Sequence, residues 1–261
     1  MAKKEITNIA GSVKLRLQNY SRNNSLEFNS VLLQYIQERF LYRISRSNYA
    51  QSFVLKGALL FLAYDISRFR PTKDIDLLGK SLPNKVDSLK EIFHDIASIS
   101  VEDGLVFDPG SVKAEEIIEQ DEYHGIRIHV VARLGTAKQQ IQIDIGFEDV
   151  IFPEPTEIDY PTLLDFKAPH LLVYSIESAI AEKFEAIVSL GIATSRMKDF
   201  YDLHYFASKK EFDLNTLHTA LKETFRNRQT SIEKRYSIFE DKFKNDGHLQ
   251  SLWTSFLKNA Y

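Results

Sequence analysis

The stretch that decides the fold is Phe53-Val-Leu-Lys-Gly-Ala58, followed by Thr72-Lys-Asp-Ile-Asp-Leu-Leu78. Its pattern predicts a strand, a turn, a helix, a loop and a second strand. Asp74 and Asp76 alternate with aliphatic residues, so a strand here places both carboxylates on one face of a sheet. Two carboxylates on one face can converge on divalent cations, the arrangement that serves in-line phosphoryl displacement. The alternative is an edge strand whose acidic face is simply solvated.

The composition excludes several classes of protein. With 261 residues, of which 44% are hydrophobic and 26% charged, the chain is typical of a globular protein with one large domain or two modest ones. No run of about 18 apolar residues occurs, so we expect no transmembrane helix. The residues after Met1 lack the apolar segment of a secretory signal. The absence of cysteine excludes disulfides, thiol nucleophiles and Cys-ligated metals, and it agrees with a cytoplasmic location.

The net charge of −3 is unevenly distributed along the chain. Residues 1–50 contain eight Lys or Arg and three Glu, a net charge of +5, so the remainder carries −8. A basic N-terminal region beside an acidic remainder could hold a polyanion near a metal-binding centre. Charge scattered over solvated helix faces is the alternative.

Periodicity predicts helices at both ends of the chain and strands between them. From Phe28 to Ile44 apolar residues recur at three- and four-residue steps, which predicts a long amphipathic helix after a turn at 23–25. The other predicted helices cover residues 58–64, 82–97, 175–189, 196–207, 214–226 and 249–259, and the other predicted strands cover 53–55, 112–118, 127–134 and 139–147.

A proline-rich segment marks the best candidate for a domain boundary. Four prolines between residues 148 and 171 break regular structure, and the pattern after them is almost wholly helical. We therefore expect an N-terminal helical layer over 1–50, a catalytic core over 51–152 and a C-terminal helical domain over 153–261.

A third carboxylate joins the acidic pair. Asp144 lies on the polar face of the strand predicted at 139–147, so three carboxylates occupy two strand faces. Oxygen ligands suit Mg²⁺, which keeps several waters and binds through a few carboxylates and substrate phosphates. The turn at Lys56-Gly57-Ala58 would present backbone N–H groups to an anion at a helix N-terminus. Asp144 could complete a metal shell or accept the proton of an attacking hydroxyl.

Four motifs in this order resemble a known family. They are Leu55-Lys-Gly-Ala58, Arg68-Phe-Arg-Pro-Thr-Lys-Asp-Ile-Asp76, Glu177-Ser-Ala-Ile-Ala-Glu-Lys-Phe-Glu-Ala186 and Arg196-Met-Lys-Asp-Phe-Tyr-Asp-Leu203. They resemble motifs of the AbiEii/AbiGii toxin family, which is related to the MenT toxins, and the resemblance as a whole spans about residues 26–207. That family is part of the DNA polymerase β-type nucleotidyltransferase superfamily.

The resemblance implies an α+β nucleotidyltransferase fold, with a short mixed β-sheet flanked by helices and a C-terminal helical domain. It implies transfer of a nucleoside monophosphate from an NTP to an acceptor, with release of pyrophosphate. The acceptor it suggests is RNA, with tRNA ends as the leading candidate, and the partner is an antitoxin encoded nearby in a toxin–antitoxin or phage-defence system. The implied cofactor is Mg²⁺, as two ions, with Mn²⁺ as a substitute.

The resemblance also assigns roles to individual residues. One departure is Ala58, which stands where the family usually has Gly or Ser and so removes a hydroxyl contact. The implied catalytic residues are Asp74, Asp76, Asp144, Lys183, Asp199 and Asp202, the metal ligands are Asp74, Asp76 and Asp144, and the nucleotide-binding residues are Lys56, Gly57, Ala58, Arg68, Thr72 and Lys183.

The C-terminal motifs also have ordinary structural interpretations. Lys198, Asp199 and Asp202 share one flank of a predicted helix, where they could form an ion-pair ladder. Lys183 could be a surface lysine whose aliphatic stem covers an apolar helix. Two functional alternatives therefore remain open: a small-molecule, antibiotic-type nucleotidyltransferase, and a non-catalytic nucleotide-binding or interaction module that keeps the fold.

Overall fold

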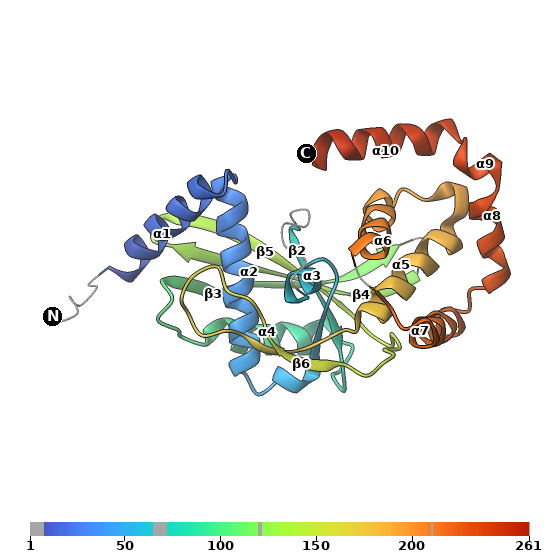
Figure 1. Cartoon of the computed structure of the whole chain (residues 1–261). Coiled ribbons are helices and arrows are strands. Elements are labelled where there is room, and N and C mark those ends of the chain that lie inside the picture. Colours follow the sequence, from blue (N-terminus) through green and yellow to red (C-terminus); the bar gives the residue numbers. More distant parts are fainter. Residues whose placement is uncertain (1–7, 65–71, 120–121, 210, 261) are drawn as a thin grey trace. The chain divides into compact units, whose positions relative to one another are not determined.

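The computed structural model describes residues 8–64, 72–119, 122–209 and 211–260 (Figure 1). The chain forms two compact units. The first, unit 1, comprises residues 1–148 and 157–173, and the second, unit 2, comprises residues 149–156 and 174–261.

Unit 1 begins with two helices, one on each side of the turn predicted at 23–25. α1 (Ile9–Asn23) ends where the backbone N–H of Asn24 bonds the last carbonyls, and Ser25 adopts a positive φ of 54°. α2 (Phe28–Arg46) begins at the Glu27 side chain, which accepts a hydrogen bond from the backbone N–H of Ser30. Two further helices complete the unit, α3 (Leu59–Ala63) and α4 (Val86–Ser98).

Seven strands, all in unit 1 except for the first residue of β6, form one mixed sheet in the order β3-β4-β5-β2-β1-β7-β6. The pairs β2–β5 and β1–β7 are parallel, whereas β1–β2, β3–β4 and β4–β5 are antiparallel. The strands are β1 (Phe53–Lys56), β2 (Asp74–Gly79), β3 (Leu105–Glu119), β4 (Glu122–Leu134), β5 (Ala137–Gly146), β6 (Thr156–Asp159) and β7 (His170–Val173).

Two of these strands correct the expectation that residues 148–171 lack regular structure. β6 and the start of β7 lie within that segment, because Pro155, Pro161 and Pro169 flank the strands and do not occupy them. The backbone N–H of Tyr160 donates to the carbonyl of Pro169, which holds the two strands together at their ends.

The core of unit 1 lies against one face of the sheet. Aliphatic residues of β2, β4 and β5 alternate with polar ones and are at most 1% exposed on that face. Here α2 contacts β5 and β7, and α4 packs on β3 and β4 (Figure 1). The polar side chains of β2 therefore project from the opposite face.

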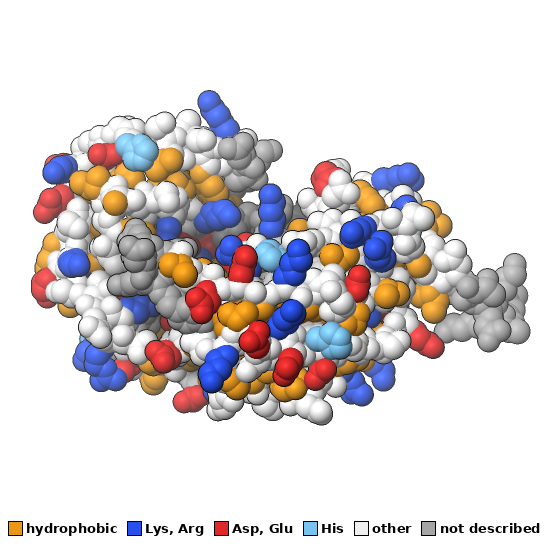
Figure 2. Space-filling view, turned by 180° about the vertical axis from the view of Figure 1, so that it is seen from behind, with side chains coloured by type: hydrophobic (Ala, Val, Ile, Leu, Met, Phe, Trp, Pro, Cys, Tyr) orange, Lys and Arg blue, Asp and Glu red, His pale blue; other side chains and the backbone are white. Residues whose placement is uncertain are grey.

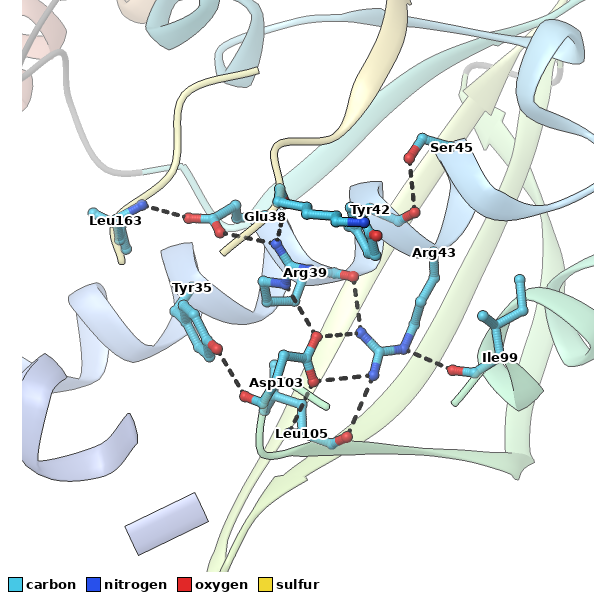
Figure 3. A network of polar contacts seen from close by, with 11 residues as sticks. Tyr35, Glu38, Arg39, Tyr42, Arg43, Ser45, Ile99, Asp103, Leu105 and Leu163 are labelled. Carbon is cyan, nitrogen blue, oxygen red and sulfur yellow. Dashed lines mark hydrogen bonds and ion pairs between the residues drawn. The ribbon is translucent and has the colours of Figure 1, made fainter. Parts of the chain in front are cut away.

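A buried ionic network fixes α2 to the loop before β3 (Figure 3). Asp103 accepts hydrogen bonds from Arg39 Nε at 3.0 Å and from both terminal nitrogens of Arg43 at 2.8 and 3.2 Å. The side chains of all three residues are at most 1% exposed. Two of the eight basic residues in the first fifty therefore stabilise the interior and cannot attract a polyanion.

One face of the molecule carries surface charges of both signs. Figure 2 shows basic and acidic side chains interspersed over the face drawn there, which favours the interpretation of scattered, solvated charge.

Unit 2 is helical, as expected, and has an apolar core of its own. Its core includes Ile187, Met197 and Phe225, with Phe243 and Leu249 from the last helices. Ser175 caps α5 by accepting a hydrogen bond from the backbone N–H of Ser178 at 3.1 Å. No helix in the described part of the chain is both long and apolar enough to cross a membrane. The helices of this unit are α5 (Ile176–Leu190), α6 (Met197–Lys209), α7 (Leu214–Asn227), α8 (Arg235–Phe239), α9 (Asp241–Lys244) and α10 (Gly247–Ala260).

Candidate active site

The acidic pair lies on the polar face of β2, as its alternation predicts. Ile75 and Leu77 are buried, whereas Asp74 and Asp76 are partly exposed. Both carboxylates therefore belong to a face where a charged ligand can reach them without complete desolvation.

Strand register extends this face into two cross-strand rows. In the first row Lys56 of β1, Asp76 of β2, Asp144 of β5 and Arg127 of β4 are successive neighbours. The charges along this row are positive, negative, negative and positive. The two acidic residues therefore sit side by side at its centre, each flanked by a base.

The second row runs parallel to the first, one pleat away. It contains Asp74 of β2, Gln142 of β5 and His129 of β4. Because same-face residues repeat every two positions, the two rows share one surface. This surface is the candidate active site of unit 1.

The backbone of Gly57 packs directly against the Asp76 carboxylate. Its φ is +67°, in the left-handed region that favours glycine, and a Cβ at this position would lie 1.9 Å from Asp76 Oδ2. Only glycine lets the backbone turn approach the acidic strand this closely. The α3 helix after the turn has five residues, and Ala58 at its N-cap supplies no side-chain hydrogen bond.

Asp144 is engaged by protein groups. Arg127 donates from Nε to Oδ1 and from Nη2 to Oδ2, both at 2.8 Å, and Gln142 Nε2 lies within 3.2 Å of both oxygens. The hydrogen bonds to Asp144 raise the pKa of Arg127, and the charges of Asp144 and Asp74 act in the same direction. The guanidinium is therefore firmly protonated, and both oxygens of Asp144 are already used.

These contacts decide which residues suit a divalent cation. Among the described residues, no group of three His, Asp or Glu side chains is arranged to hold a metal ion. Asp74 and Asp76 offer two carboxylates on one accessible face of β2, a donor set that suits Mg²⁺ when waters and substrate phosphates complete its shell. Asp144, held by Arg127, does not fit the role of third ligand in this arrangement.

Unit 2 contains a second charged cluster, formed by α5 and α6. Lys183 Nζ lies 2.6 Å from Asp199 Oδ1 and 2.7 Å from Asp202 Oδ2. The side chain of Asp202 is fully buried, and those of Lys183 and Asp199 are 14% and 12% exposed. Burial alone lowers the pKa of Lys183, but Asp202 and Asp199 together outweigh it, so the pKa is raised.

The contacts in this cluster differ from both structural interpretations of the C-terminal motifs, the ion-pair ladder on one helix and the surface lysine. Asp199 and Asp202 do share a helix flank, but the cation between them is Lys183 of α5, while Lys198 is exposed. Lys183 is likewise not an exposed lysine with a covered stem, because its ammonium group is nearly buried.

Comparison with known proteins identifies the family of this chain. A model of the family described as "Nucleotidyl transferase AbiEii toxin, Type IV TA system" matches residues 39–261. The chain belongs to this AbiEii family. It is therefore a nucleotidyltransferase, and the match includes both charged clusters and the whole sheet. No curated protein matches the sequence.

Two solved structures support the fold. The MenT4 nucleotidyltransferase toxin of Mycobacterium tuberculosis H37Rv has a TM-score of 0.54 at 16% identity, over 81% of this chain and 68% of that one. JHP933 of Helicobacter pylori has a TM-score of 0.50 at 17% identity, over 88% of this chain and 89% of that one. The predicted nucleotidyltransferase fold with its mixed sheet is thereby confirmed.

The remaining predicted residues of the AbiEii motifs have varied positions. Arg68 lies outside the described residues. Thr72 is half-buried just before β2, and its hydroxyl is 3.5 Å from the carbonyl oxygen of Asp74. Lys56 ends β1 opposite Asp76, at the start of the turn that contains Gly57.

Arg127 is the residue that sequence reasoning missed in this AbiEii chain, although a signal for it exists. A turn at Gly135 and Thr136 joins β4 and β5, and Leu134 pairs with Ala137. Counting seven residues back along β4 and seven forward along β5 pairs Arg127 with Asp144. Turn position and strand alternation together would have identified the partner of the third carboxylate.

Proposed function

We propose that the chain transfers a nucleoside monophosphate from an NTP to a hydroxyl of an RNA acceptor, as the toxin of a toxin–antitoxin pair. One observation carries the proposal. Asp74 and Asp76 share the accessible face of β2, and the Gly57 turn packs its backbone directly against Asp76. A phosphate chain placed over this turn would meet a carboxylate pair and backbone instead of a side chain.

In the proposed reaction, the acceptor hydroxyl oxygen attacks the α-phosphorus of the NTP. A new oxygen–phosphorus ester bond forms as the bond from the α-phosphorus to the oxygen bridging to the β-phosphorus breaks. Pyrophosphate leaves with that oxygen, and the hydroxyl proton passes to solvent. Asp144 is a poor candidate for the base, because Arg127 and Gln142 already use both of its oxygens.

Asp74 and Asp76 would hold Mg²⁺, which when bound neutralises phosphate charge and fixes the α-phosphate for in-line attack. Lys56 and the Gly57 backbone would orient the triphosphate beside the same strand. Excess charge from two neighbouring carboxylates is what makes this face attract a cation in the first place.

Lys183 is proposed to bind nucleotide phosphate, the role that its family motif implies. Asp199 and Asp202 would keep its ammonium protonated and fix its position, since their charges raise its pKa against the effect of burial. The two acidic residues are positioning residues in this proposal.

The toxin role rests on the family and not on a bound partner. The family description names a type IV toxin–antitoxin system, and the MenT4 title names a nucleotidyltransferase toxin. A cognate antitoxin is proposed on that basis, the RNA acceptor on the resemblance of the four sequence motifs, and Mg²⁺ on the donor set.

The proposal is tested by incubating the protein with each α-³²P-labelled NTP, Mg²⁺ and total cellular RNA. We expect label in RNA with one or more NTPs, and no label when EDTA is added. Label on the protein or on a small molecule, with none in RNA, would overturn the choice of acceptor.

A second candidate function is nucleotide binding without turnover. Two observations favour it: Ala58 offers no hydroxyl to a phosphate, and Asp144 is held by Arg127. Isothermal titration with a non-hydrolysable NTP separates the two candidates, because binding without any label transfer in the RNA assay supports the second.

A further inference from the structure

A cavity of about 320 Å³ opens beside the acidic pair, on the β5 side of β2. Lys73 and Asp74 line it at the start of β2, and His129, Gln140 and Gln142 line it from β4 and β5. All these residues belong to unit 1. The volume is at the small end of the range for sites that bind small organic molecules, about 300–1,000 Å³.

The cavity lies on the side of β2 away from the Gly57 turn. β2 has β1 as one neighbour and β5 as the other, so Lys56 and Gly57 flank the acidic pair on one side and the cavity flanks it on the other. If the proposed function is right, the NTP phosphates occupy the β1 side. The β5 side is then left for the molecule that receives the nucleotide.

The polar lining presents hydrogen-bond acceptors to an occupant. Gln140 Nε2 lies 3.1 Å from His129 Nδ1, and Gln142 Nε2 donates to both oxygens of Asp144. Each amide nitrogen is thereby engaged. In the described part of the chain neither amide oxygen of these two glutamines accepts a hydrogen bond, so each is available to a donor on a ligand.

Two further features define the chemistry of the occupant. Lys73 is exposed at the rim and offers a cation to a phosphate, while Leu33 and Ile141 give the cavity an apolar part. A ribonucleotide combines a phosphate, a flat ring with apolar faces and ribose hydroxyl donors, and so matches this lining. A deoxyribonucleotide lacks the 2′-hydroxyl donor.

We propose that this cavity binds the 3′-terminal ribonucleotide of the acceptor RNA, with Gln140 and Gln142 accepting hydrogen bonds from its ribose hydroxyls. The assignment rests on the proposed nucleotidyl transfer. It explains how a hydroxyl can be brought to the Asp74 end of the acidic pair, and it makes Gln140 a residue that selects ribose over deoxyribose.

The test measures binding without turnover. Fluorescence anisotropy at low salt compares a short single-stranded RNA, labelled at its 5′ end, with the same RNA whose last nucleotide is 2′-deoxy. We expect the all-ribose end to bind about tenfold tighter, because a net contribution of about 1 kcal/mol is typical of one hydrogen bond such as that from the 2′-hydroxyl. Equal affinities would overturn the assignment.

Gln140→Leu is the decisive variant, and Gln51→Leu is its matched control. Both glutamines are exposed residues of unit 1, so neither substitution threatens the fold, and Gln51 bonds only Glu157 at the surface in the described structure. We expect Gln140→Leu to abolish the ribose preference and Gln51→Leu to retain it. A preference that survives in Gln140→Leu contradicts the proposal.

Kinetics distinguish the acceptor from the incoming nucleotide. We expect Gln140→Leu to raise the KM for RNA about tenfold and to leave the KM for NTP within twofold. The opposite pattern would place the NTP in the cavity and overturn the assignment. If no RNA is labelled at all, nucleotidyl transfer to RNA is not the function. The anisotropy measurement still shows whether the cavity binds the 3′ end of an RNA.

Discussion

The face of β2 in unit 1 and the α5–α6 contact in unit 2 both hold a pair of aspartates, but they treat the charge in opposite ways. Asp74 and Asp76 stand partly exposed on a strand face, against the backbone of Gly57. Asp199 and Asp202 are buried or nearly so, and both contact the ammonium of Lys183 within 2.7 Å.

The difference shows that burial distinguishes charged groups that support the fold from charged groups that can bind a ligand. A buried carboxylate must be neutralised by the protein itself, because leaving it without a cation costs several kcal/mol. A carboxylate that keeps contact with water can be neutralised by something that arrives from solution. The β2 pair is thus suited to binding, whereas the Lys183 cluster must also maintain the fold of unit 2.

The largest expected effect tests the β2 side of the comparison. Asp76→Asn removes one charge from the accessible pair but keeps its shape. We expect transfer of labelled nucleotide to fall about a thousandfold, because the loss of a metal ligand costs several kcal/mol of transition-state stabilisation. Urea denaturation should show a change of less than about 1 kcal/mol in the free energy of unfolding. A large loss of stability with little loss of activity would reverse the comparison.

The second prediction concerns the buried side. Lys183→Met leaves Asp199 and Asp202 without their cation, so the free energy of unfolding should fall by about 3–5 kcal/mol in urea denaturation. Lys198→Met is the matched control, because Lys198 is exposed on α6 and its loss should cost less than about 0.5 kcal/mol. Equal stability of the two variants would mean that the buried cluster does not support the fold.

Local patterns predicted much of this arrangement. The alternation around Asp74 and Asp76 and the apolar period of α2 are properties of short segments, so the sequence alone was sufficient to predict them. The four-residue strand β7 was missed, since its identity depends on pairing with β1, more than a hundred residues earlier in the chain. Short strands carry too few residues for periodicity to reveal them.

Charge was harder to interpret than hydrophobicity, because its meaning depends on a distant partner. Arg39 and Arg43 belong to a region that is basic by composition, yet both are buried and form hydrogen bonds with Asp103. The ion pairs of Lys183 connect two helices, so the pattern within either helix could not reveal them. A count of charges in a segment cannot distinguish a binding surface from an internal ionic network.

Glu38 sharpens the comparison, because it is a buried carboxylate with weaker neutralisation. Its Oε2 accepts the backbone N–H of Leu163, and its Oε1 lies 3.6 Å from Arg39. Burial raises the pKa of Glu38 to about 7, against an ordinary value of 4.5. The folded state therefore binds this proton more tightly than the unfolded state, and stability should fall as the pH rises from about 4.5 to about 7.

Glu38→Gln should remove that dependence, which amounts to at most about 3 kcal/mol over the pH interval. Urea denaturation at several pH values between about 5 and 8 measures it. We expect the variant to be the more stable protein at the upper end and to show a flatter profile than Glu91→Gln, an exposed control on α4. Parallel profiles for both variants would mean that Glu38 is already ionised in the folded protein at pH 5.

A pair of glycine variants separates backbone strain from a disturbed acidic pair. Gly57 and Gly135 both have positive φ, +67° and +58°, so alanine at either position should cost roughly 1–2 kcal/mol of stability. A Cβ at Gly135 has nothing within 4 Å, whereas one at Gly57 would collide with Asp76 Oδ2. Gly57→Ala must therefore also displace the carboxylate, and it alone should reduce nucleotide transfer. Equal activity in the two variants would show that the fit between the turn and Asp76 is a packing feature without a part in binding.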